Sequence, residues 1–176
     1  MRLAAPGALC ERCEREGRSS TKLIWNLRAR FGGLFSCIKL IRISYHPCNN
    51  RDMNQSNPLP KISVTIPALN EEANLSALFE GFRNQTIPRE DFEVIIVDNG
   101  SCDRTREIVQ DETGIANYRL RLLAEDKKGV GYARRKGMND AAERGIRYLA
   151  GTDADSSVPP TWIADILNMF EKTGAD

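Results

Sequence analysis

The chain has 176 residues, of which 41% are hydrophobic and 28% charged, which is the size and composition of about one soluble globular domain. Five cysteines, an odd number, exclude a complete disulfide framework. The net charge of +1 hides an asymmetry, because residues 1–52 carry 10 basic and 4 acidic side chains and residues 53–176 carry 15 and 20.

Residues 1–57 are predicted to be a basic leader that lies largely outside the fold, either poorly ordered or a surface helix. The apolar start is too short for a secretion signal, and basic residues interrupt the stretch 22–45 before it could span a bilayer. That stretch could instead form a basic amphipathic helix in peripheral contact with a membrane. Alternatively, Met53 is the natural start and the preceding residues have no folded role.

Cys10 and Cys13 have the spacing of half a zinc site, but no second pair follows, so unpaired thiols are favoured. A cytoplasmic location follows, in solution or at the inner face of a membrane.

From Lys61 onward the pattern alternates between strands and helices four times. The predicted strands are 62–66, 93–98, 120–124 and 146–152, each rich in apolar residues. A helix follows each strand, and the third carries a stripe of small residues at a spacing of four, which predicts close backbone packing: Ala133, Gly137, Ala141 and Gly145. Repeated β/α units with right-handed crossovers predict a three-layer, Rossmann-like α/β fold with a mainly parallel sheet.

In such a sheet, ligands bind beyond the carboxyl ends of the strands. Polar residues interrupt the pattern just after each predicted strand, which indicates one functional rim. These interruptions are Asn70-Glu71-Glu72, Asp98-Asn99-Gly100-Ser101, Lys127-Lys128-Gly129 and Asp153-Ala154-Asp155.

Asp153 and Asp155 could hold Mg²⁺ or Mn²⁺ through carboxylate oxygens, with substrate phosphates completing the shell. They could equally cap the next helix. Asp98 closes an apolar strand, where its carboxylate could accept hydrogen bonds from a nucleotide base or ribose. Asn70 is divided between capping a helix and contacting a ligand, and Asp103 is a plausible N-cap.

The segment from Lys128 to Gly137 is similar to a phosphate-binding loop that opens a helix. As a dinucleotide fingerprint it is weak, because Arg134 replaces the third glycine and the loop follows the third strand instead of the first.

Together these motifs resemble the ordered motifs of family 2 glycosyltransferases with the GT-A fold, over roughly residues 61–176. The motifs are Val64-Thr-Ile-Pro67-Ala-Leu-Asn70-Glu71-Glu72, Val97-Asp98-Asn-Gly-Ser101, Gly129-Val-Gly-Tyr-Ala-Arg134 and Thr152-Asp153-Ala-Asp155-Ser156. On this resemblance, residues 58–176 form an incomplete nucleotide-binding domain, truncated at its C-terminus.

The resemblance also implies roles for individual residues. Asp98 would contact the base, Asp153 would approach the ribose, and Asp155, with Asp153 beside it, would hold the metal that bridges the diphosphate. The remaining predicted nucleotide-binding residues are Pro67, Ala68, Leu69, Asn70, Glu71 and Asn99 around the nucleoside, and Lys128 and Arg134 near the ribose and phosphates.

The implied reaction is a hexosyltransferase-like displacement with inversion, in which a carboxylate deprotonates the acceptor hydroxyl and the metal stabilises the departing nucleotide diphosphate. The partners would be a nucleotide diphosphate sugar and an acceptor that is a lipid, a glycan or a small molecule, and no nucleic acid. The catalytic base is expected beyond Asp176, because only 21 residues follow Asp155. This chain alone is therefore expected to bind donor but transfer sugar poorly.

Two rival interpretations use the same residues. Asp153-Ala-Asp155-Ser-Ser157 also fits the opening of haloacid-dehalogenase-like phosphatases, with Asp153 as nucleophile and Asp155 as acid and base. The other rival is a non-catalytic remnant that retains nucleotide affinity.

Overall fold

The computed structural model describes residues 39–42 and 58–172. The described elements follow one another as β1 (Lys39–Arg42), β2 (Ile62–Ala68), α2 (Leu75–Arg83), the short 3₁₀ helix η1 (Arg89–Asp91), β3 (Phe92–Asp98), α3 (Thr105–Ile115), β4 (Arg119–Ala124), α4 (Val130–Glu143), β5 (Tyr148–Gly151) and α5 (Trp162–Lys172). The four predicted β/α units are confirmed.

These strands form one sheet in the order β1-β5-β2-β3-β4. β2 pairs in parallel with both β3 and β5, and β4 pairs in parallel with β3, so the predicted mainly parallel α/β sheet is confirmed. β1 is the exception, because it pairs antiparallel with β5. Residues 39–42 therefore add an edge strand to the sheet, where the sequence had suggested a leader outside the fold or a surface helix. The rest of that proposed helix lies outside the described residues.

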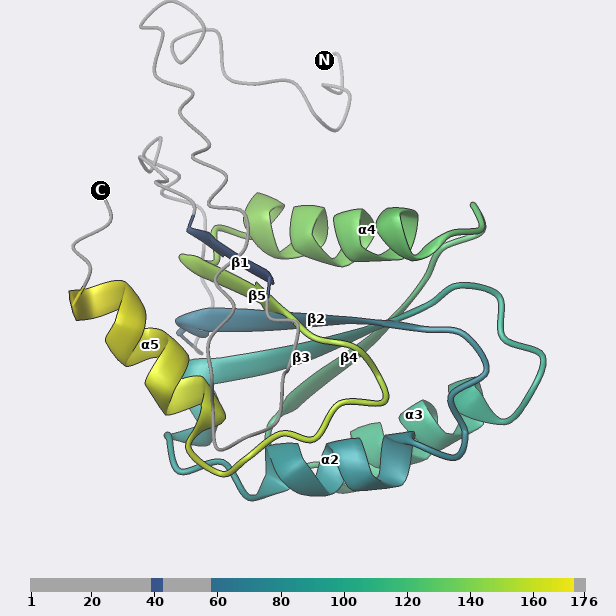
Figure 1. Ribbon diagram of the computed structural model, residues 1–176, viewed down its shortest axis with the longest axis horizontal. Helices are drawn as coiled ribbons and strands as arrows, with labels where there is room; N and C mark the ends of the chain where they lie inside the picture. Colours follow the sequence, from purple (N-terminus) through teal and green to yellow (C-terminus); the bar gives the residue numbers. More distant parts are fainter. Residues whose placement is uncertain (1–38, 43–57, 173–176) are drawn as a thin grey trace, which may run out of the picture.

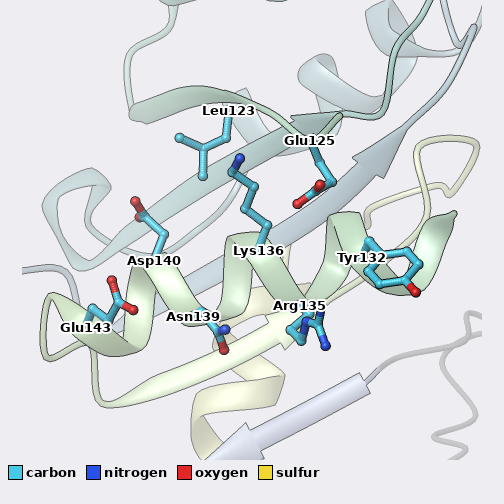
Figure 2. Close-up of a pocket in the computed structure, with 8 residues that line it drawn as sticks. All are labelled: Leu123, Glu125, Tyr132, Arg135, Lys136, Asn139, Asp140 and Glu143. Atoms are coloured by element: carbon cyan, nitrogen blue, oxygen red, sulfur yellow. The ribbon is translucent and has the colours of Figure 1, made fainter. Parts of the chain in front are cut away.

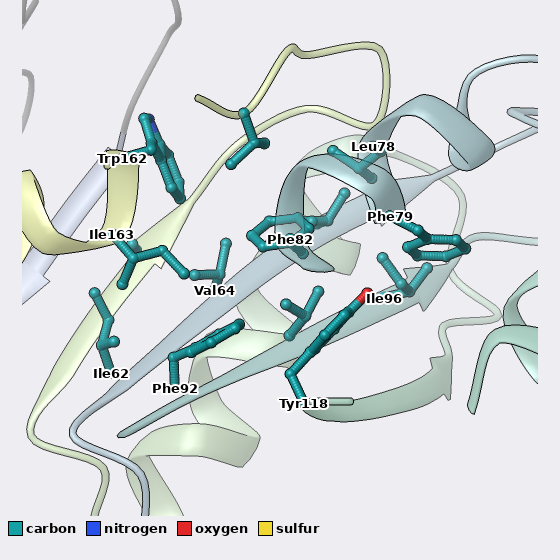
Figure 3. Packing of buried hydrophobic residues seen from close by; sticks show 14 of the residues in the cluster. Ile62, Val64, Leu78, Phe79, Phe82, Phe92, Ile96, Tyr118, Trp162 and Ile163 are labelled. Atoms are coloured by element: carbon teal, nitrogen blue, oxygen red, sulfur yellow. The ribbon is translucent and has the colours of Figure 1, made fainter. Parts of the chain in front are cut away.

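Helices cover the sheet on both faces, with α2 and α3 on one face and α4 on the other (Figure 1). β3 shows why both faces need cover: Phe92, Val94 and Ile96 enter the core on the α2 side, while Ile95 and Val97 enter the core under α4. Apart from Glu93 and Asp98, every residue of β3 is apolar, as suits a strand buried on both faces of a parallel sheet. In Figure 3 the larger core packs Phe82 of α2 near Trp162 of α5, with ring centroids 6.4 Å apart.

The small-residue stripe lets α4 pack closely against β2. Ala133, Gly137 and Ala141 are buried on this helix, whereas Gly145 lies beyond its end with a φ of +84°. A Cβ atom placed on Gly137 would lie 2.5 Å from Cγ2 of Thr65 and 3.0 Å from Cγ2 of Val97. The predicted close packing is therefore confirmed, and Gly137 is the position that requires it.

Gly137→Ala is expected to destabilise the protein, because the added methyl group overlaps side chains in a packed layer. Overpacking typically costs about 1–3 kcal/mol, and the better helix propensity of alanine returns no more than about 1 kcal/mol. Urea unfolding measures the loss. Gly114→Ala in α3, where nothing lies within 4 Å of the added atom, is the matched control and should be neutral or stabilising. Equal stability changes in the two variants would refute the close packing.

A network of charges joins the end of α4 to β3 and β4. Arg144 donates to both carboxylate oxygens of Glu93, whose side chain is only 2% exposed, and its Nε lies 2.9 Å from Oδ2 of Asp140. Arg121 of β4 also pairs with Asp140. Burial would raise the pKa of Asp140, but hydrogen bonds from Arg121 and Arg144 outweigh it and hold that pKa below its usual value. The network fixes α4 at the end of the sheet opposite the predicted rim.

No helix among the described residues is long and apolar enough to cross a membrane.

Candidate donor-binding site

The connections that follow β2, β3 and β4 all leave the same end of the sheet, on the right in Figure 1. The parallel register brings the last residues of neighbouring strands together, since Ala68 pairs with Asp98 and Asp98 pairs with Ala124. Pro67 pairs with Val97 one step earlier. The structure thus brings the first three polar interruptions of the sequence pattern to one rim, as predicted. Asp153 and Asp155 follow β5 on the other side of β2.

Asn70 ties the loop after β2 to the loop after β3. Its backbone N–H donates to Oγ of Ser101 at 3.0 Å, and its Oδ1 accepts from the backbone N–H of Cys102 at 2.9 Å. Its φ of +57° lies in the left-handed region, which asparagine tolerates better than most residues. Of the two roles suggested for Asn70, capping of the next helix is wrong, because α2 begins only at Leu75 and the side chain reaches the neighbouring loop instead.

The next two residues extend this connection. The backbone N–H of Glu71 donates to Oγ1 of Thr105 at 2.8 Å, and that of Glu72 donates to Oδ2 of Asp103 at 3.1 Å. In return, Oε2 of Glu72 accepts from the backbone N–H of Arg104 at 3.0 Å. Both glutamates precede α2, which begins at Leu75, and belong to the connection between β2 and that helix.

The Asp103 side chain accepts hydrogen bonds from both the connection after β2 and the start of α3. Besides Glu72, it accepts from the backbone N–H of Thr105, the first residue of α3, at 3.0 Å. The N-cap of α3 is Arg104, so Asp103 lies one residue before the capping position that the sequence suggested for it. Desolvation opposes ionisation, but hydrogen bonds from Thr105 and from the Glu72 backbone outweigh it and lower the pKa of Asp103. The loop therefore presents a carboxylate that remains charged at neutral pH.

Asp98 ends β3 with a side chain that is only 1% exposed. Its Oδ1 accepts from the backbone N–H of Ser101 at 3.1 Å, and its Oδ2 lies 3.4 Å from Nε of Arg106. A buried carboxylate needs partners of this kind, because desolvation of an unpaired charge is costly. Arg106 is half exposed and was not singled out by the sequence analysis. Arg106 is the second residue of α3, and no sequence pattern links it to the end of β3.

Arg134 of α4 forms an ion pair with Asp153 in the loop after β5. Arg134 is the more buried partner, with 17% of its side chain exposed against 40% for Asp153. The pair connects the helix after β4 to the loop after β5, so residues predicted for the ribose and phosphates do meet. The positive charge also partly neutralises one of the two aspartates predicted to bind metal.

Asp155 differs from Asp153, because its side chain is exposed and has no hydrogen bond or ion pair with another described residue. Ala154 between them is buried. No group of three or more histidine, cysteine, aspartate or glutamate residues among those described is arranged to hold a metal. Mg²⁺ commonly takes one or two carboxylates and fills its shell with water and phosphate oxygens, so an exposed Asp155 beside Asp153 fits such an ion.

The remaining predicted contacts differ in accessibility. Leu69 is 49% exposed at the end of β2, and Lys128 is exposed in the loop before α4. Ala68 and Asn99 are buried. Direct contact of these residues with a nucleotide stays a prediction.

A shallow groove of about 370 Å³ lies between β4 and α4, beside the rim (Figure 2). In Figure 2, Lys136 points from α4 towards β4 across this groove. Tyr132 borders it, and the centroid of its ring lies 4.2 Å from Nζ of Lys127 and 5.2 Å from the guanidinium carbon of Arg135. Because the groove includes none of Asp98, Asp153 and Asp155, the carboxylates of the rim and not this groove define the candidate site.

The family model described as Glycosyl transferase family 2 matches residues 63–176. The chain belongs to this family, as its motifs had indicated. It is 34% identical over 121 residues to the glycosyltransferase AglE of Haloferax volcanii and 31% identical over 121 residues to a dolichol-phosphate mannosyltransferase of Pyrococcus furiosus. The matches span 69% and 66% of this chain but only 39% and 31% of those proteins, so the chain corresponds to about a third of their length.

Solved structures agree on the fold. Staphylococcus aureus TarS 1–349 in complex with UDP matches with a TM-score of 0.57 and 24% identity, over 64% of this chain and 32% of that one. The mannosyltransferase PcManGT of Pyrobaculum calidifontis, in complex with GDP-Man and Mn²⁺, matches with a TM-score of 0.54 and 24% identity, over 68% and 33%. The predicted GT-A type of α/β fold is confirmed. These matches give no support to the phosphatase or the non-catalytic remnant.

Proposed function

We propose that this chain is the donor-binding part of a metal-assisted, inverting glycosyltransferase and that its rim binds a nucleotide diphosphate sugar. Family membership supports the transferase class. The observation that carries the assignment to this rim is the ion pair between Arg134 and Asp153, which joins the side of the site after β4 to the side after β5. A diphosphate placed beside this pair has a fixed cation next to it.

The loops after β2 and β3 are assigned to binding of the nucleotide base. Asp98 is held by Ser101 and Arg106, and a buried carboxylate at this point can accept N–H groups from the edge of a uracil or a guanine. The neighbouring residues from Pro67 to Glu71 are joined by hydrogen bonds to the residues that follow β3. They form the wall against which the nucleoside lies.

The phosphates are assigned to the opposite side. Lys128 supplies an exposed cation just before α4, and the first N–H groups of α4 favour an anion at the helix N-terminus. Asp153 approaches the ribose. Asp155 holds Mg²⁺ or Mn²⁺, which when bound would neutralise charge developing on the departing diphosphate.

In the proposed reaction, an acceptor hydroxyl oxygen forms a bond to the anomeric carbon on the face opposite the diphosphate. The bond between that carbon and the phosphate oxygen breaks, the nucleotide diphosphate leaves with the electron pair, and the hydroxyl proton passes to a carboxylate base. Attack from the opposite face inverts the anomeric centre. The acceptor is a lipid, a glycan or a small molecule.

Isothermal titration calorimetry with UDP and with GDP tests the donor site. One of the two should bind at least about tenfold more tightly with Mn²⁺ than with EDTA, a difference of about 1.4 kcal/mol. Failure of both nucleotides to bind would overturn the proposal, and equal affinity with Mn²⁺ and with EDTA would overturn its metal-dependent part.

A further inference from the structure

The Asn99 side chain lies at the junction of the strand ends and is only 3% exposed. Its Nδ2 donates to the backbone carbonyl oxygens of Glu125 and Lys127, at 2.8 and 2.9 Å. Its Oδ1 accepts from the backbone N–H of Gly129 at 2.7 Å. A carboxamide has two N–H donors and one carbonyl oxygen, and here both donors and the oxygen are used within the protein.

The backbone around Asn99 connects the ends of β2, β3 and β4. The Asn99 N–H donates to the carbonyl of Ala68 at the end of β2, and the carbonyl of Asp98 accepts from the Glu125 N–H just beyond β4, at 2.9 and 2.8 Å. The side chain then extends this contact across the loop as far as Gly129, the residue before α4. One residue thus fixes the path of the whole β4–α4 loop relative to Asp98.

We propose that Asn99 is a positioning residue for the diphosphate, acting through the β4–α4 loop and not by touching the nucleotide. This role rests on the proposed donor site. Lys128 is flanked by the two backbone groups that Asn99 holds, the Lys127 carbonyl and the Gly129 N–H, so its place at the rim depends on the carboxamide. The first turn of α4 depends on it in the same way.

A separate set of hydrogen bonds and an ion pair holds the nucleoside side of the rim. Asp98 is held by Ser101 and Arg106, and Glu71 by the hydroxyl of Thr105. None of these contacts includes the Asn99 side chain. Loss of the carboxamide should therefore weaken the phosphate side of the site and spare the base side.

The test compares the affinities for a nucleoside diphosphate and for its parent nucleoside in Asn99→Ala. The probes are UDP with Mn²⁺ and uridine, or GDP with Mn²⁺ and guanosine if the wild-type protein selects GDP. The diphosphate affinity should fall about tenfold or more, because buried backbone groups lose their partners and the loop relaxes. The nucleoside affinity, followed by ligand-observed NMR, should change less than about twofold, within the ordinary scatter of single-site effects.

Thr105→Val is the matched control, because it also removes a hydrogen bond between a side chain and a backbone group, here on the nucleoside side. It should weaken the nucleoside and the diphosphate by a similar factor. Asn99→Ser, which keeps one hydrogen-bonding group, replaces Asn99→Ala if thermal melting shows that the alanine variant does not fold.

The outcomes separate the two claims. If the wild-type protein binds the diphosphate and the Asn99 variant binds it with unchanged affinity, the positioning role is overturned and the donor site stands. Equal losses of nucleoside and diphosphate affinity also overturn it, since they indicate direct contact with the nucleoside or a general loss of structure. A wild-type protein that binds neither UDP nor GDP overturns the donor site and the role of Asn99 together.

Discussion

Asp155→Ala is expected to abolish Mn²⁺-dependent nucleotide binding while leaving the protein folded. The side chain is exposed and has no hydrogen bond or ion pair with another described residue, so its loss should change the free energy of unfolding by no more than about 0.5 kcal/mol. Loss of a carboxylate ligand should weaken Mn²⁺ binding by about 100-fold or more, since even outer-shell changes at metal sites cost about 10–100-fold. The nucleotide affinity measured with Mn²⁺ should therefore fall to the affinity measured with EDTA. Calorimetry with UDP or GDP, with Mn²⁺ or EDTA, measures the effect.

Asp111→Ala is the matched control, because Asp111 is also an exposed acid but lies on α3, away from the rim. It should leave both affinity and stability unchanged. Retention of the full Mn²⁺ dependence in Asp155→Ala would contradict the assignment of the metal to this residue. A similar loss in both variants would indicate a general effect of negative charge.

Arg144→Met is expected to cause the largest loss of stability. It leaves Glu93 buried without a counter-charge and removes one of the two arginines that contact Asp140. Breaking a buried ion pair from one side typically costs about 3–5 kcal/mol, because an uncompensated charge remains in the interior. Burial alone would lower the pKa of Arg144, but hydrogen bonds with Glu93 and Asp140 outweigh it and raise that pKa, which agrees with a strongly engaged guanidinium.

Urea unfolding measures this loss, and two further variants define its cause. Arg104→Met breaks an exposed pair with Glu107, whose side chains are 72% and 69% exposed, and should cost less than about 1 kcal/mol. The double variant Glu93→Leu, Arg144→Met should recover part of the stability, because no buried carboxylate is left unpaired. A loss below about 1 kcal/mol in Arg144→Met would show that the network contributes little.

The fold was largely predictable because its signals are local. The segment from Phe92 to Val97, apolar except for Glu93, indicates a strand with both faces covered, and the spacing of Ala133, Gly137 and Ala141 indicates a helix that packs closely. β1 was missed because a four-residue segment, Lys39–Arg42, fits a helix or a strand equally well by periodicity alone. Its identity depends on pairing with β5, more than 100 residues later in the chain.

The position of the rim that forms the candidate site was predictable, but the contacts within it were not. Polar residues after buried strands indicated the rim, and the family motifs indicated which of them to consider. The contacts of Asn70, Asn99 and Thr105 were not predictable, because each side chain bonds backbone groups 26 to 34 residues away in the sequence. The same residue types favour local caps and turns, which is why helix capping was one of the two roles suggested for Asn70.

Localisation of bound Mn²⁺ by paramagnetic broadening of backbone amide NMR signals tests most directly whether the rim is one donor site. With UDP or GDP present, we expect the strongest broadening at residues 153–156, with weaker broadening at residues 98–101 and 127–131. The same ion without nucleotide should broaden these signals less, because the diphosphate supplies part of the shell. Broadening centred on Glu125, Asp140 and Glu143 in the groove between β4 and α4, or no dependence on nucleotide, would contradict a single donor site at the rim.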